Sequence, residues 1–207
     1  MSSTPTSKHK VTNPLIVVIS GPSGVGKDTL IERMAELGHN HQFTVTATTR
    51  DPRPGEREGV NHHFVTREEF INMIDADELL EWAEVYGNYY GVPKQQVRDA
   101  LARGQHVLIR VDVQGARRLR QLLPEALQIF VMPPSMDSLR IRLKKRGVNT
   151  ADDMENRLNA ASDELLESEE FDYCVVNADG ALDEAVRQVT EIFERESHED
   201  PPRKYDL

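Results

Sequence analysis

A glycine-rich loop that ends in a lysine, Gly21-Pro-Ser-Gly-Val-Gly26-Lys27, is the segment of this chain best suited to chemistry. Its spacing matches G-x-x-x-x-G-K, in which backbone N–H groups surround a phosphate and the lysine reaches the terminal phosphate oxygens. An apolar run at 15–20 precedes the loop and a segment with helical spacing follows it. The dipole of that helix would favour an anion at its first residues. We therefore predict that Gly21, Pro22, Ser23, Gly24, Val25, Gly26 and Lys27 bind ATP, in preference to a plain glycine turn with a solvent-facing lysine.

The residue after Lys27 departs from this phosphate-binding pattern. Asp28 stands where the pattern has serine or threonine, and Thr29 follows one position later. Asp28 has no hydroxyl, but a carboxylate binds Mg²⁺ or its waters, and Thr29 offers a hydroxyl. We expect Asp28 and Thr29 to belong to the ATP site as well. Mg²⁺ is expected to bind together with ATP, with these two residues as candidate ligands, directly or through water.

Two arginines three residues apart, Arg50 and Arg53, lie beside a Pro/Gly turn. Two guanidinium groups there would bind a second phosphate through bidentate, charge-assisted hydrogen bonds. The alternative is a pair of surface arginines bonded to Glu56, Glu58 or Asp51, and charge alone favours that alternative. The motif around the two arginines decides between these interpretations.

Composition limits the classes of protein to which the chain can belong. Its 207 residues are 38% hydrophobic and 29% charged, with a net charge of −10. That charge argues against nucleic-acid binding, which needs a broad basic face. The sequence has no apolar run of the roughly 20 residues that a membrane helix needs, and its first residues are polar, so we expect a cytoplasmic protein. The single cysteine, Cys174, is expected to be buried in an apolar strand.

Apolar runs rich in β-branched residues predict buried strands. Helical spacing lies between and after these runs, so the chain predicts an α/β fold in which helices cover both faces of a parallel sheet. The predicted strands are 15–20, 106–113, 127–132 and 173–177, and the predicted helices are 28–37, 94–103, 114–122, 135–146, 152–168 and 181–195.

Two segments interrupt the alternation of strands and helices. Residues 44–92 mix short strand-like pieces, a Pro/Gly turn and a helix that opens with the capping box Thr66 to Glu69, which predicts an inserted mixed α+β lobe. Residues 136–166 are helical and rich in arginine, which predicts a lid. We expect one domain over 14–197, with its core in 14–43, 93–135 and 167–197, and flexible tails at 1–13 and 198–207.

The predicted inserted lobe carries the motifs that indicate which molecule receives the phosphate. It reads TTRDPRPGEREG at 48–59, HHFV at 62–65 and EWAEVYGNYYG at 81–91, with RVDVQGA at 110–116 and LRIRLKKRG at 139–147 farther along. This series resembles the guanylate kinases, whose lobe has T-T-R-x-P-R-x-G-E-x-x-G, then Y-x-F-V, then E-x-A-x-x-x-G-N-x-Y-G. The resemblance covers roughly 14–195 and implies a P-loop kinase that transfers the γ-phosphate of ATP to GMP, and to dGMP.

The resemblance also implies how GMP is bound. Arg50, Arg53 and the hydroxyl of Tyr90 would contact its phosphate, with Gly91 in the same motif. Glu81 would accept hydrogen bonds from guanine N1 and N2, which adenine cannot match, and Thr46 takes a position near the base. Asp112 lies where the strand 106–113 ends, and ligands of open α/β sheets bind beyond strand carboxyl ends, so it too is expected to contact GMP.

The lid would carry the catalytic arginines. Arg142 and Arg146 are four residues apart and share a helix face, and Arg157 resembles the third lid arginine of the family. Together with Lys27 they would neutralise charge on the transferring phosphoryl group. The alternative is a solvated helix whose arginines pair with Asp and Glu. Asn177 resembles a residue beside the adenine of ATP.

Three further positions depart from the guanylate kinase pattern. His62 stands where a second phosphate-contacting tyrosine is usual, so we expect a pH-dependent GMP affinity. Val92 replaces a serine or threonine whose hydroxyl helps to bind guanine O6. Arg110 replaces an acid two residues before Asp112, and it would contact phosphate or pair with Asp112.

Two other functions have to be weighed against a guanylate kinase. One is a small-molecule kinase on the same scaffold, resembling ribose bisphosphate phosphokinases, which Glu81 and the intact 81–91 motif argue against. The other is a non-catalytic guanylate-kinase-like binding module, in which the phosphate loop is degraded. Lys27 and all three lid arginines are present here, so the sequence favours the enzyme.

Overall fold

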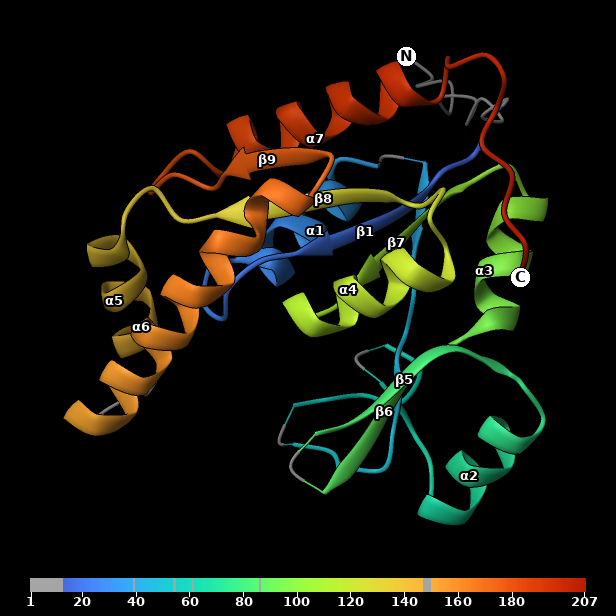
Figure 1. Ribbon diagram of the computed structural model, residues 1–207, viewed down its shortest axis with the longest axis horizontal. Helices are drawn as coiled ribbons and strands as arrows, with labels where there is room; N and C mark the ends of the chain where they lie inside the picture. The colour runs from blue at the N-terminus through green and yellow to red at the C-terminus, as the bar shows by residue number, and fades with distance from the viewer. Residues whose placement is uncertain (1–12, 39, 54, 61, 86, 147–149) are drawn as a thin grey trace, which may run out of the picture.

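Five parallel strands form the central sheet of the computed structural model, in the order β2-β7-β1-β8-β9 (Figure 1). β1 lies in the middle and all five of its residues are buried, as expected for a strand covered on both faces. The strands are β1 (Ile16–Ser20), β2 (His41–Phe43), β7 (His106–Arg110), β8 (Leu127–Met132) and β9 (Tyr173–Val176). The structure describes residues 13–38, 40–53, 55–60, 62–85, 87–146 and 150–207.

Helices cover both faces of this sheet, which confirms the predicted α/β fold. Side chains alternate along β1, so Val17 and Ile19 join an apolar cluster with α1, α5, α6 and α7, while Ile16 and Val18 join a cluster with α3 and α4. The helices are α1 (Lys27–Glu36), α3 (Lys94–Ala102), α4 (Val113–Leu122), α5 (Met136–Lys145), α6 (Ala151–Leu166) and α7 (Leu182–Glu196), and a 3₁₀ turn, η1 (Glu167–Glu170), follows α6.

Residues of the 44–92 segment form a second sheet, in the order β4-β3-β6-β5. β3 and β4 are parallel, and β6 is antiparallel to both β3 and β5. This lobe has its own small core of Ala47, Phe70 and Leu79. The capping box of α2 is confirmed: Glu69 N–H donates to the Thr66 hydroxyl, and the Glu69 carboxylate accepts from Thr66 N–H at 2.7 Å. Its elements are β3 (Ala47–Thr48), β4 (His63–Phe64), α2 (Arg67–Asp75), β5 (Leu79–Val85) and β6 (Asn88–Pro93).

The edge strands differ from the expectations. The β5–β6 hairpin and the three-residue β2 have no counterpart among the predicted strands. β9 is at the edge of the central sheet, so its residues alternate in exposure instead of being uniformly buried. The prediction that Cys174 is buried is therefore wrong: its side chain is exposed, and its sulfur lies 3.6 Å from the carbonyl oxygen of Ser168.

The C-terminal residues differ from the expected flexible tail. Tyr205 and Leu207 pack against the apolar cluster of α3 and α4, and Ile16 N–H donates to the Tyr205 hydroxyl at 3.0 Å. Arg203 pairs with Glu196 at 2.6 Å. Apolar contacts, a hydrogen bond and an ion pair thus hold this segment on the core. The first 12 residues of the expected N-terminal tail lie outside the described residues. None of the described helices combines the length and the apolar character needed to cross a membrane.

Candidate active site

The loop between β1 and α1 has backbone conformations that need glycine. Gly21 has a φ of +136°, and a Cβ there would lie 2.2 Å from the carbonyl oxygen of Val131. Gly26, with a φ of +93°, is the N-cap residue of α1. Side chains at such positions are strained, so the local sequence and the loop shape agree. The loop ends at the N-terminus of α1, whose N–H groups and dipole favour a bound anion.

Lys27 folds back across this loop. Its Nζ donates to the carbonyl oxygens of Gly21 and Pro22, the second at 3.2 Å. Burial lowers the pKa of Lys27 to about 8, although the charge of Glu164 raises it and that of Arg110 lowers it again. The lysine is therefore still cationic at neutral pH. Glu164, on α6, was not among the predicted site residues, because an acid on a charged helix gives no sign that it faces a loop.

Two residues that depart from the guanylate kinase pattern meet beside the loop. Arg110, at the end of β7, pairs with Asp28 in the first turn of α1. The ion pair of Arg110 among the described residues is thus with Asp28 and not with the expected Asp112, and its contact with phosphate stays a prediction. Thr29 is exposed and lies about 200° around the helix from Lys27, so it projects from another side of α1. The structure therefore brings one candidate metal ligand, Asp28, to the loop.

Asn177 and Arg142 donate hydrogen bonds to the backbone of the loop. Asn177 Nδ2 and Arg142 Nη1 each donate to the carbonyl oxygen of Val25 at 2.8 Å. Arg142 Nη2 also donates to the Asn177 carbonyl oxygen at 2.7 Å and to Asp179 Oδ1 at 2.7 Å. In this structure both side chains thus bind protein groups that shape the loop. The adenine contact of Asn177 and the phosphoryl contact of Arg142 stay predictions.

The other two lid arginines lie in different surroundings. Arg146 is the C-cap residue of α5, and its positive charge lowers the pKa of both Lys27 and Arg110. It therefore lies on the side of the lid that faces the loop. Arg157 is exposed on α6. The catalytic roles of Arg146 and Arg157 stay predictions.

Arg50 and Glu56 form a bidentate ion pair at the turn of the lobe. Arg50 Nη1 donates to Glu56 Oε2 at 2.8 Å, and Nη2 donates to Oε1 at 3.0 Å. The same carboxylate accepts from Arg53 N–H at 2.7 Å, so it fixes the turn that carries both arginines. The Arg50 and Arg53 bonds lower the pKa of Glu56 to about 2. The Glu56 pairing considered for the arginines exists for Arg50, whereas the side chain of Arg53 is exposed.

Two buried polar atoms beside this turn have no hydrogen-bond partner among the described residues: Arg50 Nε and His62 Nδ1. The ring of His62 lies edge-on to that of Tyr90, with centroids 6.2 Å apart. Burial and the charge of Arg50 lower the pKa of His62, so its ring is neutral at neutral pH. Arg50 Nε is a donor, and His62 Nδ1 becomes one when the ring is protonated, so this part of the lobe is suited to an anionic ligand.

Thr46 and Gly91 line the same part of the lobe in different ways. The Thr46 carbonyl oxygen accepts from His63 N–H at 3.0 Å, which ties the strand that carries the histidines to the site. A Cβ on Gly91 would lie 3.0 Å from Leu79 and from Phe70, so the bare face of Gly91 packs against the core of the lobe. Gly91 is thus needed for packing, and its contact with GMP stays a prediction.

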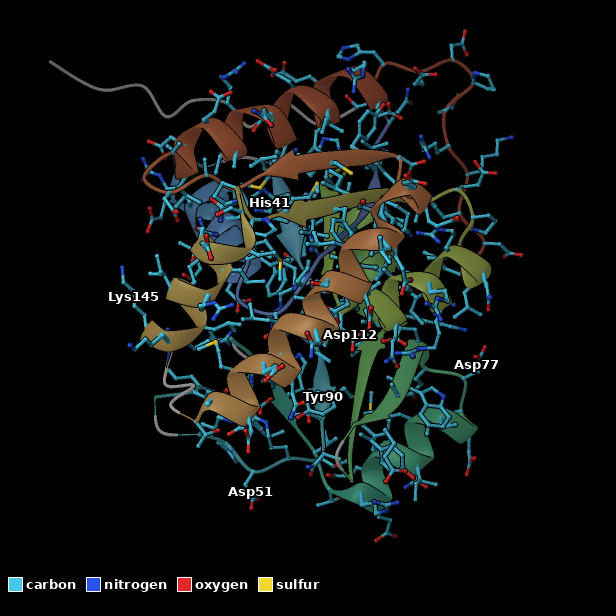
Figure 2. All side chains as sticks on the ribbon, turned by 60° about the vertical axis from the view of Figure 1, so that its left-hand side comes forward. His41, Asp51, Asp77, Tyr90, Asp112 and Lys145 are labelled. Atoms are coloured by element: carbon cyan, nitrogen blue, oxygen red, sulfur yellow. The ribbon has the colours of Figure 1, made fainter. Side chains whose placement is uncertain are left out.

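Glu81 and Asp112 bring two carboxylates together from the lobe and the core. Glu81 is buried on β5, and burial raises its pKa, with a further contribution from Asp112. Asp112 caps α4 by accepting from Gly115 N–H at 2.7 Å, and its charge also acts on Lys27. In Figure 2 Asp112 lies at the margin of the core that faces Tyr90 on the lobe. Asp112 therefore lies between the loop and the lobe.

A pocket of ≈390 Å³ separates α4 from α6 next to Asp112. A core helix and a lid helix thus face each other across open space. The side chains that line it are Val113, Gln114, Arg117, Arg118, Ala160, Asp163, Glu164 and Glu167.

Comparison with known proteins agrees with this arrangement. The family model described as guanylate kinase matches residues 13–196. A guanylate kinase of Synechococcus sp. is 46% identical over 178 residues, which cover 86% of this chain and 81% of the relative. One of Carboxydothermus hydrogenoformans is 41% identical over 182 residues, covering 88% of each chain. The crystal structure of guanylate kinase from Anaplasma phagocytophilum superposes with a TM-score of 0.72 at 34% identity, covering 91% of this chain and 88% of that one. By these measures the chain belongs to the guanylate kinase family.

Proposed function

We propose which residues of this chain bind ATP, which bind GMP, and which stabilise the γ-phosphoryl group during its transfer. The observation that carries the proposal is the pairing of two cationic sites on facing parts of the molecule. Lys27 lies on one side, and the guanidinium of Arg50, whose buried Nε has no partner among the described residues, lies on the other. Asp112 lies between them. One site would bind the phosphates of ATP and the other the phosphate of GMP.

In phosphoryl transfer the protein aligns the two substrates and neutralises charge on the transferring group, and it forms no covalent bond with them. The loop at 21–27 would hold the ATP phosphates, and Arg50, Arg53 and Tyr90 would orient the attacking oxygen of GMP. Lys27, Arg142, Arg146 and Arg157 would stabilise the charge that develops on the transferring group. We propose that the lobe 44–92 and the lid 136–166 close over the core 14–43, 93–135 and 167–197, which excludes water.

The residues beside the loop fit a magnesium ion bound together with ATP. Mg²⁺ commonly takes one or two carboxylates and completes its shell with phosphate oxygens and water. Asp28 supplies one carboxylate next to Lys27, held by Arg110. When bound, the ion would neutralise charge on the β- and γ-phosphates. Asp28 would hold it, and the exposed Thr29 would not.

We propose that the protein selects GMP through its guanine base. Glu81, as a carboxylate, accepts from the N1–H and N2–H of guanine, and adenine presents an acceptor at N1. Val92 lies opposite Glu81 in the β5–β6 register and is buried against α3 and α4. It therefore serves packing, and selection depends on Glu81. Neither group is given a role at the 2′ position of the sugar in this proposal, so dGMP is expected to be accepted as well.

The test is a coupled assay of ADP formation with GMP, dGMP, AMP, UMP and ribose bisphosphate. We expect turnover with GMP and dGMP and little with the other acceptors. Turnover with ribose bisphosphate instead would support the other small-molecule kinase. A titration that detects no ATP binding would support a binding module. The cytoplasmic location and the absence of nucleic-acid binding stay predictions.

His62 predicts a pH-dependent affinity for GMP. Its pKa is lowered in the free protein, so it is neutral at pH 7, and a neighbouring phosphate dianion would favour its protonated form. Affinity should therefore increase as pH falls from about 7.5 to about 5.5, the range in which histidine titrates. The measurement is the ratio of GMP KM between His62→Tyr and wild type against pH, which cancels protonation of GMP itself. We expect the ratio to rise as pH falls, and a constant ratio would exclude a charge on His62.

A further inference from the structure

Glu81 is a carboxylate in an environment that disfavours its charge. Its side chain is 7% exposed, on the strand of the lobe that packs against α4. Burial raises its pKa, and the negative charge of Asp112 at the start of α4 raises it further. Without compensation such a group takes up a proton more readily than an exposed glutamate.

The compensating charge comes from the core, not from the lobe. Arg118, one and a half turns along α4 from its N-cap Asp112, donates from Nε to Glu81 Oε2 at 2.9 Å. This bond and the charge of Arg118 lower the pKa of Glu81, opposing burial. Val92, which lies opposite Glu81 on β6, is uncharged. Arg118 is thus the cation that faces Glu81 among the described residues that act on its pKa.

Protonation of Glu81 would change what the side chain recognises. An ionised carboxylate accepts two hydrogen bonds, which suits the N1–H and N2–H donors of guanine. A protonated carboxyl group gains a donor, which matches the N1 acceptor of adenine and no longer matches the N1–H of guanine. The protonation state of Glu81 would therefore shift its preference between the two purines. Arg118 uses one lone pair of Oε2, which leaves Oε1 and the other lone pair of Oε2 for the base.

We propose that Arg118 is a positioning residue that sets guanine specificity by holding Glu81 ionised and oriented. The inference rests on the proposed contact of Glu81 with guanine. It goes beyond that contact because Arg118 acts from the core through the carboxylate, without touching the substrate. It also links the base site to α4, whose N-cap Asp112 lies beside the loop for ATP.

The experiment compares Arg118→Met and Arg118→Lys with Arg117→Met. Arg117 is the matched control, because it is the neighbouring arginine on α4 and pairs instead with Glu167 at 2.7 Å. For Arg118→Met we expect the GMP KM to rise about tenfold at pH 7.5 with kcat little changed, since one charge-assisted bond is lost. The rise should grow as pH falls toward about 6, and kcat/KM for AMP relative to GMP should increase. Arg118→Lys should restore part of the loss, and Arg117→Met should match wild type.

Two outcomes separate this inference from the proposed function. If Glu81→Gln leaves the GMP KM and the preference over AMP unchanged, Glu81 does not recognise the base, and both proposals fail. If Glu81→Gln impairs GMP use while Arg118→Met shows the same GMP KM profile and AMP preference as wild type, the inference about Arg118 alone is overturned. A pH-independent rise in KM with unchanged AMP preference would also overturn it, because it would indicate a purely structural role. Thermal unfolding of each variant verifies that the fold is retained.

Discussion

Replacing Lys27 by methionine is expected to lower kcat by about 10³-fold at neutral pH, because one preorganised cation at a developing charge contributes about that much. Methionine keeps the length of the side chain and removes the ammonium that donates to Gly21 and Pro22. Steady-state kinetics with ATP and GMP provide the measurement. Thermal unfolding is the control, since loss of a desolvated charge should not destabilise the fold. A variant that retains more than a tenth of wild-type kcat would contradict the role given to Lys27.

The lowered pKa of Lys27 also predicts that nucleotide affinity decreases at alkaline pH. Its pKa of about 8 lies below the ordinary lysine value of 10.5, so the free protein loses this cation as pH rises through 8. Phosphates bind the protonated form, and affinity is therefore present below that pH and weakens above it. Calorimetric titration with ADP should show a rising Kd between pH of about 8 and 9.5 in wild type. Lys27→Arg, whose guanidinium keeps its proton, should show a flat profile over that range.

The core of the fold could be predicted because its signals are local. A strand buried on both faces appears in the sequence as a continuous apolar run. The strand predicted at 127–132, for example, coincides with β8. The phosphate loop is equally local, since its glycines and lysine occupy seven consecutive positions. The β5–β6 hairpin could not be predicted this way. It combines acids with aromatic residues such as Trp82, which is 42% exposed, and gives no regular alternation.

The partners of the site residues were harder to predict than the residues themselves. Glu81 could be named from its motif, but Arg118 is 37 positions away and meets it only because α4 packs against β5. Asp28 and Arg110 each stood out as a departure, and their pairing depends on the adjacency of β1 and β7 in the sheet. Sequence patterns report spacing within an element, whereas these contacts are set by how elements pack.

Arg50 makes the ion pair that was the alternative to its role at the GMP phosphate, and that role stays a proposal. The bidentate pair with Glu56 uses both Nη atoms and leaves Nε buried without a partner among the described residues. Nε is therefore a donor that the ion pair does not use. We infer that Glu56 aims the guanidinium so that Nε faces the phosphate of GMP.

Arg50→Ala is accordingly expected to raise the GMP KM by about 100-fold and to leave the ATP KM within about twofold, because charge-assisted bonds to one substrate are lost. Glu56→Gln is the informative comparison. It weakens the ion pair but keeps Arg50, so its GMP KM should rise far less. Arg67→Ala removes an arginine of the same lobe that stacks on Tyr89 at 4.5 Å, and it should match wild type. Equal losses in Arg50→Ala and Glu56→Gln would show that Arg50 acts only by shaping the turn, and the acceptor phosphate would then need another ligand.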